Sequence, residues 1–261
     1  MIWIDPSLSI LPTNRPLRDL FEYCMQLRGE TFRSHKNRCT QKIRIGGEEY
    51  FLKQHHGTGW REIFRHLIQF RWPVTDAKRE WRALCYLASL NIPVPEVCAL
   101  GTKGINPANR RSFLLTRALP AHVSLEDLAG TPLPPKLKHR LIEKVAHLAG
   151  TFHHAGLNHR DLYLCHFLLE RSSLLAGRDC TDPTVHVIDL HRADVRQKTP
   201  RRWIIKDLAA LDFSSRTAGL SSADRLRFVR AWTRAFGCGQ NAAFWKKVKQ
   251  RGDRLWQKHG A

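Results

Sequence analysis

The order of apolar and polar residues in the first half of the chain predicts antiparallel strands. Two runs with strand character, residues 40–45 and 48–54, are separated only by Gly46 and Gly47. A pair of glycines supplies the positive φ angles that a two-residue hairpin turn needs. The mostly apolar residues 112–116 have the length and composition of a buried strand. We therefore expect a small sheet that includes a tight hairpin.

A helix is predicted between the hairpin and the buried strand. Its apolar residues recur at positions i, i+3, i+4 and i+7, and they are Trp81, Leu84, Cys85 and Ala88. Thr75 precedes this pattern and is placed to cap a helix over residues 76–90. Glu80 would then lie near the start of that helix.

Helical spacing dominates the second half of the chain. A break at the proline-rich residues 132–135 precedes a long apolar stripe, and Gly156 is placed to end the helix that the stripe predicts. The stripe consists of Leu137, Leu141, Val145, Leu148 and Phe152. Short strands are predicted at residues 167–169 and 185–188, followed by segments rich in Arg and Trp with helical spacing. The second half should be mostly helical.

The charge of the chain is high and unevenly distributed. Its 261 residues carry 43 Lys and Arg against 23 Asp and Glu, which gives a formal net charge of +20. Residues 119–189 hold 7 basic and 8 acidic side chains, whereas residues 190–261 hold 17 and 5. A near-neutral segment within a basic protein is where we expect carboxylates that hold a metal ion. A basic chain suits nucleic acid, an anionic membrane or a phosphorylated substrate.

Other features exclude several classes of protein. The 43% content of hydrophobic residues is that of a folded chain rather than a disordered one. No apolar run approaches the roughly 20 residues that cross a bilayer, and the first residues do not resemble a secretion signal. The seven cysteines include no C-x-x-C pair, which argues against a zinc ribbon and a disulfide framework. We expect a protein of a reducing cytoplasm.

The strongest local motif is His159-Arg160-Asp161-Leu162, which follows the predicted long helix. It resembles the kinase catalytic loop H-R-D-L-x-x-x-N. In that loop the Asp accepts the proton of the acceptor hydroxyl, and the residue five positions later helps to hold a metal. Asp161 and His166 occupy these two positions.

Three further residues stand in the order that a kinase requires. Asp189 ends an apolar strand 28 positions after Asp161, where the metal-binding Asp of the D-F-G motif belongs. Lys53 lies on the second hairpin strand and Glu80 in the next helix, as in the ion pair that directs a lysine to the donor phosphates. Each residue alone would be an ordinary surface charge. Together with Asp161, they predict phosphoryl transfer, with Asp189 as the principal metal ligand.

Two features depart from the protein-kinase pattern. No G-x-G-x-x-G precedes Lys53, and the turn expected to cover the phosphates, residues 33–38, is basic instead. Lys36 and Arg38 in this turn could replace backbone amides as phosphate ligands. His166 stands where kinases have Asn. A neutral imidazole can bind a divalent metal, but Mg²⁺ prefers oxygen, so His166 could instead position a metal-bound water.

With these motifs, the chain resembles the lipopolysaccharide core heptose kinases, a branch of the larger Kdo kinase group. The resemblance covers roughly residues 15–216, and its most specific blocks are H-R-D-x-Y-x-x-H-F-L-L from His159 and I-D-L-H-R from Ile188. Further matching segments are Tyr50-Phe51-Leu52-Lys53, Gly57-Thr58-Gly59-Trp60-Arg61-Glu62-Ile63-Phe64, Arg79-Glu80-Trp81, Arg201-Arg202-Trp203 and Lys206-Asp207-Leu208. In this family, His166 and His191 look like ordinary variants of kinase residues.

The resemblance implies an α+β, bilobal, protein-kinase-like fold. A small β-rich N-lobe would cover residues 1–118 and a mostly helical C-lobe residues 119–261. It implies that ATP and Mg²⁺ phosphorylate the first heptose of a lipopolysaccharide core precursor, at the cytoplasmic face of the inner membrane. Asp207 resembles the buried aspartate that braces the catalytic loop. Acyl carrier protein is a further partner that the resemblance admits, because its acidic surface suits a basic chain.

Alternatives remain at three points. The substrate could be Kdo or another core sugar, and a protein-tyrosine kinase activity is conceivable. A nucleic-acid-binding protein would suit the charge, but it leaves Lys53, Glu80, Asp161 and Asp189 unexplained, so we expect no nucleic-acid partner. The amphipathic residues 60–72 fit either a helix in the interface of an anionic membrane or a helix packed on the small lobe. The same two interpretations apply to residues 245–256.

Overall fold

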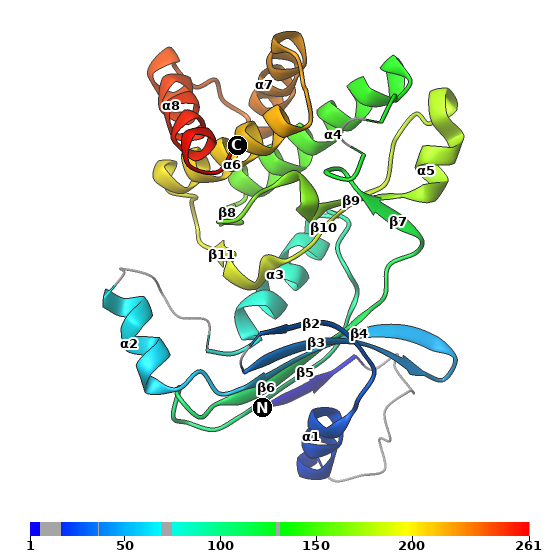
Figure 1. Cartoon of the computed structure of the whole chain (residues 1–261), viewed down its shortest axis with the longest axis vertical. Helices are drawn as coiled ribbons and strands as arrows, with labels where there is room; N and C mark the ends of the chain where they lie inside the picture. Colours follow the sequence, from blue (N-terminus) through cyan, green and yellow to red (C-terminus); the bar gives the residue numbers. More distant parts are fainter. Residues whose placement is uncertain (6–16, 36, 69–74, 129–130, 261) are drawn as a thin grey trace. The chain divides into compact units, whose positions relative to one another are not determined.

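The computed structural model describes residues 1–5, 17–35, 37–68, 75–128 and 131–260. The chain divides into two compact units (Figure 1). Unit 1 comprises Met1–Cys85 and Pro95–Leu119, and unit 2 comprises Tyr86–Val94 and Pro120–Ala261. An antiparallel sheet dominates unit 1 and helices dominate unit 2, which confirms the predicted α+β class.

The sheet of unit 1 has six antiparallel strands in the order β1-β5-β6-β4-β3-β2. The strands are β1 (Ile2–Ile4), β2 (Glu30–His35), β3 (Arg38–Ile45), β4 (Glu48–His56), β5 (Val97–Lys103) and β6 (Arg111–Arg117). The predicted hairpin is confirmed, because Gly46 and Gly47 both have positive φ angles and join β3 to β4. The strand predicted at residues 112–116 is β6.

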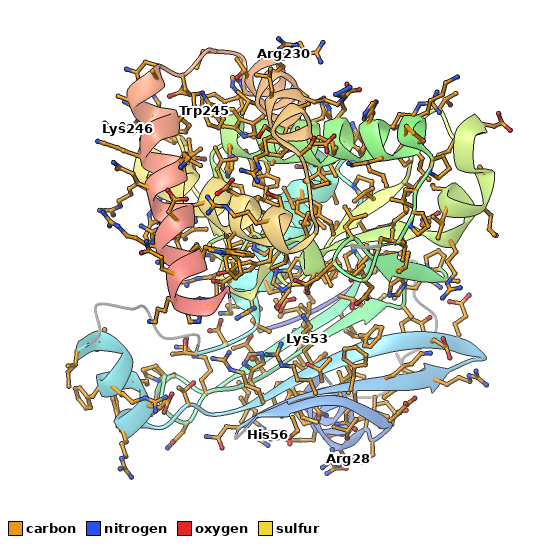
Figure 2. The ribbon with its side chains drawn as sticks, turned by 45° about the horizontal axis from the view of Figure 1, so that its top comes forward. Arg28, Lys53, His56, Arg230, Trp245 and Lys246 are labelled. Atoms are coloured by element: carbon orange, nitrogen blue, oxygen red, sulfur yellow. The ribbon has the colours of Figure 1, made fainter. Side chains whose placement is uncertain are left out.

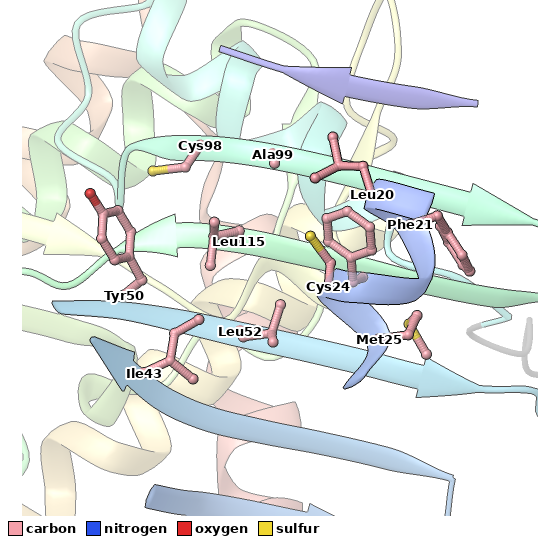
Figure 3. Close-up of a cluster of buried hydrophobic side chains, with 11 residues drawn as sticks. Leu20, Phe21, Cys24, Met25, Ile43, Tyr50, Leu52, Cys98, Ala99 and Leu115 are labelled. Atoms are coloured by element: carbon pink, nitrogen blue, oxygen red, sulfur yellow. The ribbon is translucent and has the colours of Figure 1, made fainter. Parts of the chain in front are cut away.

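The core of unit 1 lies between this sheet and α1 (Leu17–Gln26), as Figure 3 shows. Leu20, Phe21, Cys24 and Met25 recur at helical spacing and cover one face of the sheet. Burial in this apolar core raises the pKa of the Cys24 thiol to about 12, so this cysteine is un-ionised and serves as a packing residue. The residues of β4 that alternate with the buried ones project from the opposite face of the sheet.

The helix predicted over residues 76–90 is α3 (Lys78–Ser89). The predicted capping residue, Thr75, was wrong. The side chain of Asp76 accepts a hydrogen bond of 3.0 Å from the amide of Lys78, and Asp76 also pairs with Arg110 at 2.9 Å. Asp76 lies closer to the first helical turn than Thr75, and its carboxylate suits the positive end of the helix dipole.

Unit 2 is built around α4 (Pro135–His154), which confirms the predicted long helix. Pro134 and Pro135 begin it, and Gly156 follows its end with a φ of +94°. A Cβ at Gly156 would lie 1.8 Å from the carbonyl oxygen of Arg196, so only glycine fits here. The remaining helices are α2 (Trp60–Ile68) in unit 1, and α5 (Arg171–Ala176), α6 (Arg201–Thr217), α7 (Ser222–Phe236) and α8 (Ala242–His259) in unit 2.

Short strands of unit 2 hold the loops that carry the candidate catalytic residues. A three-stranded antiparallel sheet has the order β10-β9-β7, and a two-stranded ladder pairs β11 with β8. Their bounds are β7 (His122–Ser124), β8 (Leu157–Asn158), β9 (Phe167–Glu170), β10 (Val185–Val187) and β11 (Asp194–Val195). The predicted strands at residues 167–169 and 185–188 are thus β9 and β10. Across the described residues, no helix combines the length and apolar character needed to span a membrane.

Candidate active site

Lys53 and Glu80 form an ion pair in unit 1. Neighbouring side chains of a strand point to opposite faces. Leu52 and Gln54 are buried on the α1 side, so Lys53 projects from the other face of the sheet. There its Nζ contacts the carboxylate of Glu80, which lies in the first turn of α3 and is only 4% exposed. Lys53 is labelled in Figure 2. The predicted contact between these two residues is confirmed.

The basic turn predicted at residues 33–38 is shorter than expected, because residues 33–35 belong to β2 and Arg38 belongs to β3. Arg38 is the first residue of β3 and pairs with His55 in the ladder, while Thr40 pairs with Lys53. Cross-strand partners share a face. Arg38 therefore lies on the same face as Lys53, two positions along the strand. Lys36, the other predicted phosphate ligand, lies outside the described residues.

The loop that carries Asp161 is held by a buried carboxylate. Asp207 of α6 is fully buried and accepts hydrogen bonds of 2.7 Å from the amides of His159 and Arg160. Arg160 has a φ of +75°, a left-handed conformation that is uncommon for a residue with a side chain. Its guanidinium lies over the ring of Trp203, 4.2 Å from the centroid. The expected bracing role of Asp207 is confirmed by this geometry.

Two cations flank the carboxylate of Asp161. One Oδ atom lies 2.9 Å from Nη1 of Arg192, and the other lies 3.7 Å from Nζ of Lys206. Lys206 is mostly buried, and this burial lowers its pKa, although Asp161 opposes the effect. The carboxylate of Asp161 therefore lies between two positively charged side chains.

Asp189 follows β10 and has a left-handed backbone conformation, with φ of 61° and ψ of 48°. One of its Oδ atoms contacts Nδ1 of His191, and the other lies 3.4 Å from Nε2 of His166. The opposite nitrogen of His166, Nδ1, donates a hydrogen bond of 2.7 Å to the backbone carbonyl of Asp161. His166 therefore connects the Asp161 loop to Asp189.

His159 packs between the same two loops. Its ring is stacked on His166 with centroids 5.4 Å apart, and its Nε2 donates to the carbonyl oxygen of Ile188 at 3.0 Å. Complete burial lowers the pKa of His159, so the ring is a neutral donor. Burial also acts to lower the pKa of His166, but the hydrogen bond with Asp189 raises it to about 10. His166 is therefore a cation paired with the carboxylate of Asp189, and its Nε2 must lose its proton before it can bind a metal.

These residues fit a divalent metal that arrives with phosphates. In the part of the chain that the structure describes, no group of three His, Cys, Asp or Glu side chains is placed to hold a metal alone. Mg²⁺ does not need one, because phosphate oxygens and water usually complete its coordination. The carboxylate of Asp189 would supply the oxygen ligand that Mg²⁺ prefers. Nδ1 of His166 donates to the backbone carbonyl of Asp161, so Nε2 is the ring nitrogen that faces the carboxylate of Asp189.

The sequence motifs located most of this site but not all of it. The structure brings Asp161, His166 and Asp189 together in unit 2, and joins Lys53 to Glu80 in unit 1. Sequence reasoning assigned no role to Arg192 or Lys206. Both lie in segments that the family resemblance includes, so the signal was present. Only the fold shows that they converge on Asp161.

Comparisons with known proteins agree with this geometry. A family model described as the lipopolysaccharide kinase (Kdo/WaaP) family matches residues 22–232. The lipopolysaccharide core heptose(I) kinase WaaP of Pseudomonas aeruginosa is 42% identical over 221 residues, 83% of this chain and 81% of that protein. The same-named kinase of Escherichia coli K12 is 41% identical over 219 residues, 82% of each. A solved structure, WaaP in complex with acyl carrier protein, superposes with a TM-score of 0.79 at 32% identity, covering 98% of this chain and 99% of that one.

Proposed function

Because the chain belongs to the lipopolysaccharide kinase (Kdo/WaaP) family, we propose that it transfers the γ-phosphoryl group of ATP to a heptose hydroxyl of the lipopolysaccharide inner core. The names of the two relatives, both core heptose(I) kinases, support this acceptor. The observation that carries the proposal is the carboxylate of Asp161, presented by a braced loop between Arg192 and Lys206.

Asp161 is the general base of the proposed reaction. It accepts the proton of the heptose hydroxyl while the hydroxyl oxygen bonds to phosphorus and the bond from phosphorus to the ADP oxygen breaks. Arg192 and Lys206 hold the carboxylate in place before the reaction. Their positive charges also lie beside the attacking oxygen, where they stabilise the charge on the transferring group.

Lys53 and Arg38 bind the phosphates of the donor in this proposal. Glu80 holds the Nζ of Lys53 in a defined position through the buried ion pair. Preorganising a cation in this way avoids the cost of ordering a flexible side chain during the reaction. Glu80 is therefore a positioning residue rather than a catalytic one.

Asp189 and His166 would hold the metal ion of the reaction. Bound Mg²⁺ would neutralise the charge of the donor phosphates. Asp189 offers an oxygen ligand, and its left-handed backbone points this carboxylate toward His166. The hydrogen bond from His166 to the Asp161 carbonyl fixes the spacing between metal ligand and base.

We place this reaction at the cytoplasmic face of the inner membrane, with the protein bound peripherally. ATP is a cytoplasmic substrate, and lipopolysaccharide precursors are anionic amphiphiles in the membrane. The net charge of +20 supports attraction to such a surface.

Acyl carrier protein is the proposed protein partner, on the strength of the solved relative in complex with it. Unit 2 contains a cavity of about 680 Å³ whose lining is mostly apolar and includes Leu141, Val145, Leu211 and Trp245. Lys249 also lines it. The volume and lining suit the acyl chain that such a carrier bears, and the cation suits its acidic surface.

The proposed function is tested with purified protein, radiolabelled ATP and isolated core acceptors. Transfer of label to heptose-containing core, and not to a Kdo-only acceptor, is the expected result. Mass spectrometry of lipopolysaccharide from cells with and without the gene should show the loss of one phosphate on heptose. Labelling confined to the Kdo-only acceptor would replace this proposal by a Kdo kinase.

A further inference from the structure

Helix α2 presents an apolar face to solvent. Trp60, Phe64, Leu67 and Ile68 recur at positions i, i+4, i+7 and i+8, which places them on one side of the helix. Their exposed fractions are 50%, 56%, 44% and 78%. The rings of Trp60 and Phe64 lie next to each other, with centroids 5.8 Å apart. Four large apolar side chains on a nine-residue helix form a continuous patch, which we call the α2 patch.

The α2 patch is not what attaches the helix to unit 1. Ile63 performs that task, because it is only 5% exposed and lies beside the patch around the helix. The backbone just before the helix is also tied to the unit, since the amide of Gly59 donates to the carbonyl of Ala108 at 2.9 Å. Substitutions in the exposed patch should therefore leave the fold of unit 1 intact.

Two arginines border the α2 patch on the side of the helix away from Ile63. Arg61 and Arg65 are one helical turn apart and both are exposed. Arg65 pairs with Glu62 of the same helix. A Trp-containing apolar face bordered by arginines is the composition of a helix that lies in a membrane interface, with the apolar side chains in the acyl region and the cations among headgroups.

Helix α8 has the same sequence pattern as α2, but its apolar side is buried rather than exposed. Phe244 and Val248 on its apolar side are buried, and the ring of Trp245 packs 5.5 Å from Trp232 of α7. Figure 2 shows Trp245 turned toward the protein and Lys246 turned outward. The packed interpretation therefore applies to α8, whereas the apolar face of α2 has no such cover among the described residues.

We propose that α2 binds the surface of an anionic lipid bilayer, with the α2 patch inserted among the lipids and Arg61 and Arg65 at the phosphates. The apolar patch supplies the attraction that salt does not screen, and the two arginines supply the preference for anionic lipid. This inference deepens the proposed function, because the proposed acceptor is a membrane amphiphile. Binding to lipid can nevertheless be measured without the reaction.

The first test removes the apolar surface. Full-length protein is mixed with vesicles of phosphatidylcholine and phosphatidylglycerol, and the bound fraction is measured by flotation. The variant Trp60→Ser/Phe64→Ser/Ile68→Ser should bind at least about tenfold more weakly, because the apolar insertion is lost. A matched control, Leu175→Ser/Leu226→Ser, removes two exposed but isolated apolar residues of unit 2. It should bind like the wild type.

The second test removes charge. Arg61→Gln/Arg65→Gln should weaken binding to anionic vesicles by about fivefold per arginine at low salt, and should have little effect on vesicles of phosphatidylcholine alone. Lys246→Gln/Lys247→Gln makes the same change of charge on α8, whose apolar side is buried. This control should reduce binding much less than the α2 variant.

Three outcomes would overturn the inference. They are failure of the wild type to bind anionic vesicles, equal binding by the α2 variants, and loss of binding to purified acyl carrier protein by variants that still bind vesicles. The last result would make α2 a protein-docking helix. Phosphorylation of a soluble, deacylated core oligosaccharide is measured in parallel and should be unchanged in all variants. If even the wild type fails that assay, the proposed function fails, while the vesicle results still decide the role of α2.

Discussion

Replacing Asp207 by Asn should damage both the stability of unit 2 and the reaction. The carboxylate is completely buried and accepts two hydrogen bonds of 2.7 Å from consecutive amides, those of His159 and Arg160. The imidazole of His153 lies 3.3 Å from the same group. An aspartate can accept all of these bonds because it is acceptor-only when ionised.

The size of the expected loss of stability follows from the hydrogen bonds that an asparagine side chain can still accept. Asn keeps one acceptor oxygen, so one of the two backbone amides must face an NH₂ group instead. A hydrogen bond to a charged group contributes about 1.5–3 kcal/mol, and an unsatisfied buried amide costs about 1–3 kcal/mol more. We expect the free energy of unfolding to fall by about 3–5 kcal/mol. Typical domains have about 5–15 kcal/mol, so most molecules should still be folded at 25 °C.

The effect on the reaction should exceed the effect on folding. Arg160 keeps its left-handed conformation only while its amide is held, and Asp161 is the next residue. A shift of the base by about 1 Å lowers the rate on the order of a hundredfold. Urea unfolding followed by Trp fluorescence gives the stability, and kcat is measured per folded molecule.

Asp224→Asn is the matched control. Asp224 is also a buried aspartate of unit 2, and it caps α7 through Ser221 and pairs with Lys138 at 2.7 Å. It has no contact with the catalytic loop in the described structure, so its substitution should lower stability but leave kcat per folded molecule unchanged. If Asp207→Asn behaves like this control, the idea that Asp207 positions Asp161 is refuted.

Three further predictions concern the proposed base, the ion pair in unit 1 and the dependence of stability on pH. Asp161→Asn should lower kcat by about 10²–10⁴-fold without changing the thermal midpoint by more than a few degrees, and near-normal phosphorylation would contradict its role as base. Lys53→Met and Glu80→Gln should each lower kcat/KM for ATP, and the double variant should be little worse than Lys53→Met, because Glu80 acts through the lysine; additive losses would show independent roles. Burial acts to raise the pKa of Asp224, but hydrogen bonds with Lys138 and Ser221 lower it to about 2, from 3.8 when unfolded. The carboxylate therefore stabilises the fold above pH 4 by about 1–2 kcal/mol, which is lost as the pH falls toward 2, so urea midpoints of wild type and Asp224→Asn should converge at low pH.

Local sequence was sufficient to predict those parts of the fold that depend on a single turn or helix. The Gly46-Gly47 hairpin and the long helix α4 were predicted because turn chemistry and helical periodicity act over short distances. The pairing of Lys53 with Glu80 was also predictable, since the order of strand and helix restricts which residues can meet. Thr75 was wrong for the opposite reason. Two neighbouring residues could cap α3, and the contact of Asp76 with the distant Arg110 favours Asp76.

Burial of an amphipathic helix cannot be predicted from its own pattern. Residues of α2 and α8 both alternate apolar and basic side chains at helical spacing, and both left two interpretations open. The outcome depends on whether another element covers the apolar side. Phe244 and Trp245 meet Trp232 of α7, whereas Phe64 meets only Trp60 of its own helix among the ring contacts of the described residues.

The surroundings of Asp161 explain the uneven distribution of charge along the chain. The near-neutral residues 119–189 supply the carboxylates Asp161 and Asp189, and the strongly basic residues 190–261 supply Arg192 and Lys206. Sequence alone shows a near-neutral segment followed by a strongly basic one. The strand pairing of β11 with β8 and the bracing of the loop by α6 bring the segments together, so that two cations of the second segment lie beside the carboxylate of Asp161 in the first. In the proposed reaction, the same two cations would attract the anionic donor toward Asp161, and this accounts for an acidic side chain at the proposed reactive centre of so basic a protein.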